Sequence, residues 1–167
     1  RKAMEMAKIG PDEVDALIIA TLTPDMLFPS TACIVQHKLG LGPIPAFDVD
    51  AACSGFIYGL ETARGILMAN PKYKNVVLVG AEKLSSIIDW EDRATCVLFG
   101  DGAGAVVLSR DETAGGGELL GVQLGANGKN APLIHMPGGG SQIPSTVDSV
   151  QARQHFLKMN GREVFKL

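Results

Sequence analysis

The sequence predicts an α/β fold with a mainly parallel central sheet and helices on both of its faces. Two observations predict it. Residues 14–21 and 75–80 are almost entirely apolar and have strand length, as expected for strands buried on both faces. Strand-like segments also alternate with segments of helical periodicity, which is typical of βαβ units.

Typical helix-ending and helix-capping residues mark the bounds of the first predicted elements. Residues 1–8 have the composition of a helix interior, and Gly10 and Pro11 end that pattern. The apolar strand 14–21 follows. Ser30 is a suitable N-cap for the next helix, which Gly40 closes.

A second strand at 45–50 leads directly into a long helix. This helix ends at the Asn70-Pro71 pair and is followed by the third strand, 75–80. Its apolar stripe, at the spacing of a packed helix, consists of Phe56, Leu60, Ala63 and Leu67.

The remaining segments alternate between apolar stretches and glycine-rich loops. We expect an apolar, strand-like segment at 94–99 and strands at 105–109 and 118–126. Between the last two lies the loop 115–117, and a longer loop at 138–149 precedes a helix that begins near Val150.

Composition narrows the class of protein. The net charge is −3 without a basic stripe, so nucleic acid is not an expected partner. The apolar runs are far shorter than the roughly 20 residues that a bilayer span needs, so no membrane partner and a cytoplasmic location are expected. Three cysteines without a CxxC pair and three scattered histidines predict neither a disulfide scaffold nor a metal site; they are Cys33, Cys53, Cys96, His37, His135 and His155.

Cys53 is the candidate nucleophile, because it stands where a buried strand passes into a helix. Its small neighbours Ala51, Ala52 and Gly55 allow a sharp turn. The helix N-terminus favours a thiolate by only about 0.3–1 kcal/mol, so a further partner, usually a histidine, is expected. Position alone leaves open the alternative of an ordinary buried cysteine.

The other two cysteines are expected in the core, Cys33 within an apolar helix and Cys96 within an apolar strand.

Four ordered segments carry a resemblance to a known family. Residues 48–56 (DVDAACSGF), which include Cys53, resemble the active-site segment of β-ketoacyl-[acyl-carrier-protein] synthase III, a thiolase-like condensing enzyme. The flanking segments match in the same order, and the similarity covers nearly the whole chain; they are 28–33, 92–105 and 159–166. The resemblance implies most of the first thiolase-like half at 1–127, a linker at 128–149 and the opening helix of the second half at 150–167.

The resemblance also implies an activity. Cys53 would accept the acyl group of an acyl-CoA, typically acetyl-CoA, and pass it to malonyl-acyl-carrier protein in a decarboxylating Claisen condensation that initiates fatty acid synthesis. The resemblance implies a homodimer, and it implies no cofactor. The implied substrate-binding residues are Arg93 for the CoA nucleotide, Phe28 across a dimer interface, Phe99 and Met159 in the pocket, and Gly161 beside the CoA arm.

The family's histidine and asparagine partners of the cysteine lie in its second half, and nothing here corresponds to them. We therefore expect this chain to be a fragment that is inactive alone.

Two alternatives remain open, a structural subunit or fragment without catalysis and a cysteine hydrolase. The hydrolase lacks a suitably spaced histidine. A nicotinamide site at Gly100–Ala105 is rejected, because a strand rather than a helix is expected after it.

Overall fold

The computed structural model describes residues 1–110 and 116–167, which form two compact units. The sheet unit comprises residues 1–82 and 102–124, and the loop unit comprises residues 83–101 and 125–167. The predicted boundaries of the two thiolase-like halves remain a prediction.

The main sheet has four strands in the order β2-β1-β3-β4. Strand β1 (Ala16–Ala20) is parallel to both of its neighbours, β2 (Ala46–Val49) and β3 (Asn75–Lys83). The outer strand is β4 (Asp101–Ser109). The Arg110 N–H donates to the Lys74 carbonyl at 2.9 Å, which sets the end of β4 beside the start of β3 and makes this pair antiparallel. The sheet is therefore mixed but mainly parallel, as predicted.

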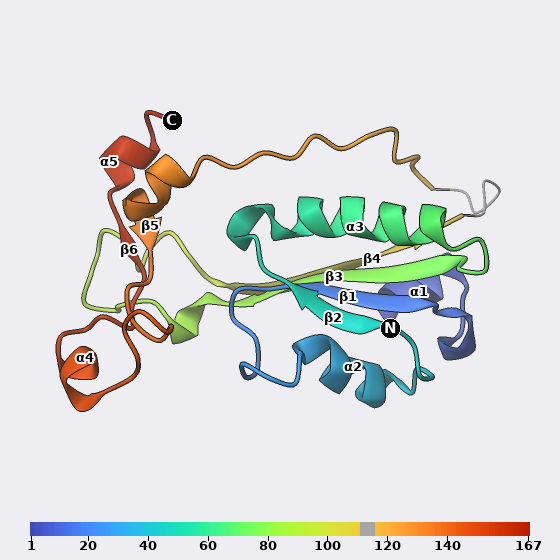
Figure 1. The fold of residues 1–167 in the computed structure, drawn as a ribbon, viewed down its shortest axis with the longest axis horizontal. Helices are drawn as coiled ribbons and strands as arrows, with labels where there is room; N and C mark the ends of the chain where they lie inside the picture. Colours follow the sequence, from blue (N-terminus) through green and yellow to red (C-terminus); the bar gives the residue numbers. More distant parts are fainter. Residues whose placement is uncertain (111–115) are drawn as a thin grey trace. The chain divides into compact units, whose positions relative to one another are not determined.

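Helices lie on both faces of this sheet. Figure 1 shows α3 (Gly55–Ala69) over one face and α2 (Thr31–Leu39) over the other. Short segments complete the unit, namely α1 (Lys2–Ala7), η1 (Pro11–Glu13) and η2 (Ala52–Ser54). The predicted order of helices and strands is confirmed from α1 to β3 and for β4.

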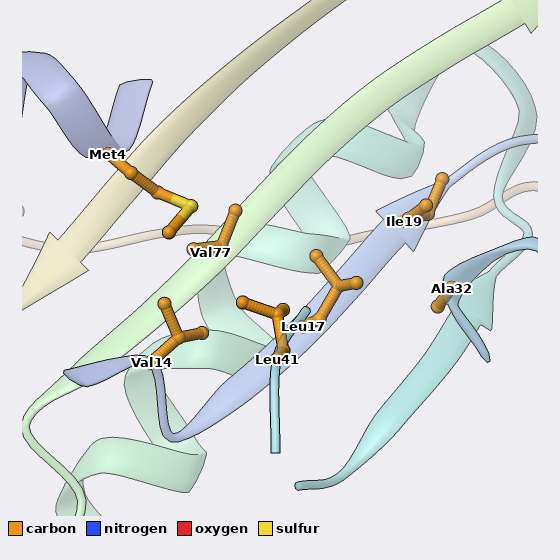
Figure 2. Packing of buried hydrophobic residues seen from close by; sticks show 7 residues of the cluster. All are labelled: Met4, Val14, Leu17, Ile19, Ala32, Leu41 and Val77. Atoms are coloured by element: carbon orange, nitrogen blue, oxygen red, sulfur yellow. The ribbon is translucent and has the colours of Figure 1, made fainter. Parts of the chain in front are cut away.

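The alternation of side chains along β1 divides the core into two layers. Leu17 and Ile19 pack in the cluster that includes Met4 of α1 and Ala32 of α2 (Figure 2). Ala16 and Ile18 pack in the cluster on the α3 side. All of β1 is buried, which explains why its sequence is apolar without alternation.

The stripe of α3 faces this second cluster. Ala63 and Leu67 are buried in it, and Phe56 and Leu60 pack against it. The predicted apolar face is therefore correct.

The loop unit consists of short elements. Strand β5 (Ile134–His135) pairs antiparallel with β6 (Lys158–Met159). The other elements are η3 (Leu84–Ser86), η4 (Gly128–Leu133), α4 (Val147–Gln151) and α5 (Gly161–Val164).

Three expectations for the later part of the chain are wrong. Residues 118–126 form no strand, and residues 93–98 form consecutive turns instead of a strand. The single helix expected from Val150 is replaced by α4, β6 and α5, because Arg153 adopts a left-handed φ of 55° just after α4. Gly115 of the predicted loop lies outside the described residues.

No helix within the described parts of the chain is long and apolar enough to cross a membrane.

Candidate active site

Cys53 lies at the edge of the sheet where the parallel strands end. Because β1, β2 and β3 run in the same direction, their carboxyl ends share one edge, where ligands bind in open α/β sheets. The Thr21 N–H donates to the Val49 carbonyl at 3.1 Å, which joins the ends of β1 and β2. Asp50 and Ala51 then lead into η2, which contains Cys53.

The turn before α3 is tight. Ala52 adopts a φ of 45°, in the left-handed region that non-glycine residues rarely occupy. Asp50 Oδ1 accepts the Ala52 N–H at 3.1 Å, and the Ala51 carbonyl accepts the Ser54 N–H at 3.1 Å. These two hydrogen bonds hold the turn in shape.

Small residues surround this turn. A Cβ at Gly55 would lie 3.4 Å from the Ala20 Cβ, so the first residue of α3 approaches β1 closely. Cys53 is exposed, whereas the half-buried Cys33 lies beside Ser30 Oγ, with its Sγ 3.2 Å away. The structure therefore presents Cys53 openly at a helix start, as the sequence predicts for a nucleophile.

Cys33 and Cys96 are both half-buried. The expectation that they lie in the core is wrong, because Cys33 is beside the polar cap of α2 and Cys96 is in a turn.

A cleft of about 370 Å³ lies at the same edge of the sheet unit. Its walls come from the ends of β1 and β2 and from the loop between β1 and α2; they are Thr21, Pro24, Met26, Leu27, Ser30, Phe47, Asp48 and Asp50. Phe28 stands in the same loop and is 83% exposed. The structure thus places Phe28 and Cys53 in the same unit. No other part of the described chain buries the Phe28 side chain.

Two carboxylates that the sequence analysis missed hold this loop. Glu82 accepts the Leu22 N–H at 3.0 Å and the Thr23 hydroxyl at 2.6 Å. Asp48 accepts the N–H groups of Thr31 and Ala32 at 2.7 and 2.8 Å, at the start of α2. A charged residue inside an apolar strand was the available signal for Asp48.

The histidine of the sheet unit is not beside Cys53. His37 occupies the last turn of α2. Because α2 begins beside Asp48 at the carboxyl edge of the sheet, its last turn lies toward the opposite edge. The histidine partner expected for Cys53 is therefore not His37.

The other predicted site residues belong to the loop unit. Arg93 is exposed within the turns of 93–98, and Phe99 follows them, half-buried. Met159 is half-buried in β6, and Gly161 begins α5. A Cβ at Gly161 would lie 3.3 Å from the Met159 Cε, so these last two residues are neighbours.

The Arg93 turns have a polar framework. Asp92 Oδ1 accepts the Ala94 N–H at 3.0 Å, and its other oxygen accepts the Thr95 hydroxyl at 2.9 Å. Asp89 Oδ1 accepts the Glu91 N–H at 3.0 Å. Two carboxylates therefore shape the backbone on either side of Glu91.

Asp89 is also the centre of an ion-pair cluster that the sequence analysis missed. Arg153 Nε donates to Asp89 Oδ2 at 3.0 Å, and a second guanidinium nitrogen bonds Oδ1. The Arg153 hydrogen bond, aided by the Glu91 N–H and the charges of Arg153 and Lys158, lowers the pKa of Asp89 despite its burial. At neutral pH Asp89 is a carboxylate anion.

A second acidic group at the start of β4 is also stabilised. The Ser85 hydroxyl and N–H donate to Asp101 at 2.7 and 2.8 Å, which lowers the pKa of Asp101. Neither aspartate belongs to a metal site: within 1–110 and 116–167, no group of three or more His, Cys, Asp or Glu residues is arranged to hold a metal ion.

Comparisons with known proteins agree with this architecture. The family model for 3-oxoacyl-[acyl-carrier-protein (ACP)] synthase III matches residues 47–128, which include Cys53. The β-ketoacyl-[acyl-carrier-protein] synthase III of Natranaerobius thermophilus is 50% identical over 165 residues, which cover 98% of this chain and 50% of the relative. The protein of the same name from Caldanaerobacter subterraneus is 50% identical over 166 residues, 99% of this chain and 49% of the relative.

Solved structures give the same result. The 3-oxoacyl-[acyl-carrier-protein] synthase III of Aquifex aeolicus superposes with a TM-score of 0.81 at 45% identity, over 98% of this chain and 47% of that protein. The synthase III of Pseudomonas aeruginosa has a TM-score of 0.81 at 36% identity, over 98% and 47% of the two chains.

Fold and comparisons together place the chain among proteins with the thiolase-like fold. Within that class, the chain belongs to the β-ketoacyl-[acyl-carrier-protein] synthase III family. It spans about half the length of the curated relatives it matches.

Proposed function

We propose that the protein containing this chain is an acyltransferase in which Cys53 carries the acyl group. The observation that supports this most directly is the exposed Cys53 thiol at the start of α3, within the segment that matches the synthase III family. An ordinary buried cysteine does not account for this exposed position at a tight turn.

The reaction has two halves. In the first, the Cys53 thiolate attacks the thioester carbonyl of an acyl-CoA, typically acetyl-CoA; a new thioester forms and the CoA thiolate leaves. In the second, malonyl-acyl-carrier protein loses carbon dioxide, and the resulting carbanion attacks the acyl group on Cys53. A carbon–carbon bond forms and the Cys53 thiolate is released. The N–H of Cys53 is one donor for the oxyanion of each step.

The loop unit supplies the CoA contacts in this proposal. Arg93 presents an exposed, planar guanidinium that can stack on adenine and bind phosphate. Phe99 and Met159 line the pocket, and Gly161 lets backbone approach the pantetheine arm. The half-buried positions of Phe99 and Met159 are consistent with these roles.

A homodimer belongs to the same proposal. Met26, Leu27 and Phe28 are 48, 90 and 83% exposed in one loop, an apolar surface that a second copy would cover. Phe28 would then reach the acyl pocket of the partner subunit. A dimer that dissociates on substitution of Phe28 by Asp, in sedimentation experiments on the full-length protein, would support this arrangement.

Acylation can be tested directly. The full-length protein is incubated with isotopically labelled acetyl-CoA and analysed by mass spectrometry of its cysteine peptides. We expect the label on the Cys53 peptide, and its complete loss in Cys53→Ala. The matched controls Cys33→Ala and Cys96→Ala should retain it. Label retained by Cys53→Ala would remove Cys53 from the reaction, and cleavage of peptide substrates without acylation would favour a cysteine hydrolase.

A further inference from the structure

An ion-pair cluster joins two segments of the loop unit that lie far apart in sequence. Asp89 and Arg153 are 64 residues apart and bond through both carboxylate oxygens. Lys158 Nζ lies 3.9 Å from the same carboxylate. Beside this cluster, the Leu157 N–H donates to the Ile87 carbonyl at 2.8 Å.

The contacts in this cluster fix the orientation of the Asp89 and Arg153 side chains. The Asp89 side chain is only 7% exposed, and a bidentate guanidinium–carboxylate pair fixes orientation as well as distance. The Arg153 guanidinium also lies over the Phe156 ring, 5.1 Å from its centroid, which further restricts its position. The backbone of Arg153 has a left-handed φ of 55°, a strained conformation that the surrounding contacts maintain.

Each joined segment carries residues of the proposed CoA site. Arg93 follows Asp89 by four residues, and Asp89 accepts the Glu91 N–H just before the turns of 93–98. Met159 adjoins Lys158 in β6. A shift of the Asp89–Arg153 pair therefore moves the nucleotide-binding and pocket-lining segments relative to each other.

We propose that Asp89 and Arg153 are positioning residues for acyl-CoA: their ion pair holds the Arg93 turns against the segment of Met159 and so sets the affinity for the nucleotide end of the substrate. This inference rests on the proposed acyltransferase function. Neither side chain reacts with substrate, and the acyl transfer to Cys53 does not depend on them once the thioester is in place.

Two acyl donors separate this role from a general structural one. Acetyl-CoA carries the nucleotide, whereas the acetyl thioester of N-acetylcysteamine lacks it and still presents the same reacting group. In the full-length protein, we expect Asp89→Asn and Arg153→Gln each to lower kcat/KM for acetyl-CoA about tenfold, mainly through KM. The rate with the N-acetylcysteamine thioester should fall much less, because this donor has no nucleotide for Arg93 to bind.

The chain offers a matched control. Glu91 also contacts Arg153, at 3.2 Å, but its side chain is 80% exposed. Because an exposed ion pair contributes little, Glu91→Gln should leave KM for both donors unchanged. Arg153→Lys keeps the charge but loses the bidentate geometry. Its KM for acetyl-CoA should lie between the values for Arg153→Gln and the native protein.

A double-mutant cycle tests whether Asp89 acts through Arg93. If it does, Asp89→Asn causes no further loss for acetyl-CoA once Arg93 is alanine. Equal losses with both donors, or no loss with acetyl-CoA, would overturn the inference while native acylation of Cys53 still supports the proposed function. Failure of the native protein to become acylated by either donor would overturn both.

Discussion

The sheet unit and the loop unit are stabilised by different means. In the sheet unit, β1 and β3 contribute fully buried aliphatic side chains, among them Leu17, Ile18 and Leu78. In the loop unit, the buried side chains include Ile88 and Leu157, but also the polar Asp89, Thr95 and Ser149, each of which makes hydrogen bonds. Apolar layers stabilise the sheet unit, whereas a network of hydrogen bonds and ion pairs helps to stabilise the loop unit.

This difference matches the tasks proposed for the two units. A nucleophile must keep its position relative to the oxyanion donors, and Cys53 is attached to a strand and a helix that are packed on apolar layers. A loop that binds a long cofactor-like substrate can be adjusted by a few polar contacts without disturbing a core. The same difference makes the two units sensitive to different substitutions and conditions.

The largest effect is expected from a truncation in β1. Ile18 has no exposed surface and packs against α3, so Ile18→Ala leaves a cavity between the sheet and the helix. We expect a loss of about 2–5 kcal/mol in the free energy of unfolding, measured by denaturant titration of the full-length protein. Hydrogen exchange should become faster across β1 and β3.

The half-exposed Ile57 of α3 is the control, because Ile57→Ala removes the same atoms from a side chain that is 44% exposed. Ile57→Ala should lower the free energy of unfolding much less than Ile18→Ala does. An equal loss in both variants would mean that burial on the two apolar layers is not what stabilises this unit.

The sheet unit was predictable because its signals are local and repeated. Residues 16–20 are apolar throughout because β1 is buried on both faces, and Ser30 and Gly40 flank α2 as cap residues with the expected geometry. Cys53 was identified from the strand-to-helix turn and the motif around it. The cleft beside Asp48 was not, because it depends on how the loop between β1 and α2 folds back over the sheet edge.

The second prediction concerns acid. The pKa of Asp89 lies below its ordinary value of 3.8, chiefly because of the Arg153 hydrogen bond. A group with a lowered pKa stabilises the folded state above its unfolded pKa, and this contribution is lost as pH falls through the folded pKa. The loop unit should therefore open below about pH 4, which pepsin cleavage within 84–99 would detect.

Asp89→Asn provides the comparison for this experiment. Its amide does not titrate, so the variant should be cleaved more readily than the native protein near pH 5 and about equally at the lowest pH, where the native Asp89 is protonated. A constant ratio of the two cleavage rates over the whole range would show that Asp89 ionisation does not stabilise these turns. Peptides from β1 should show no such dependence.

The loop unit was poorly predicted for the same reason that we expect it to be acid-sensitive. Its order depends on pairs such as Asp89 with Arg153, whose partners are distant in sequence and follow no periodic pattern. Residues 118–126, of which 118–124 belong to the sheet unit, are apolar enough for a strand, yet Gly121 and Gly125 weaken that strand and no strand pairing forms there. The residues after Val150 have helical composition, but Arg153 leaves the helical region directly after α4.

The smallest effects come from a pair of glycines on α3. A Cβ at Gly59 would lie 2.5 Å from Leu78 Cδ1 and within 3.5 Å of two more atoms of the same fully buried side chain. At Gly65, a Cβ would meet nothing within 4 Å. The same substitution thus tests the closeness of helix and sheet at one site and helix propensity alone at the other.

We expect Gly65→Ala to stabilise the protein by up to about 1 kcal/mol, because alanine favours the helix. Gly59→Ala gains the same propensity but forces Leu78 to move within a close-packed layer, at a cost of about 1–3 kcal/mol, so its net effect should be destabilising. Thermal unfolding of both variants measures the difference. If Gly59→Ala is as stabilising as Gly65→Ala, then α3 and β3 are not closely packed, and the position of Cys53 at the start of α3 is set by its turn alone.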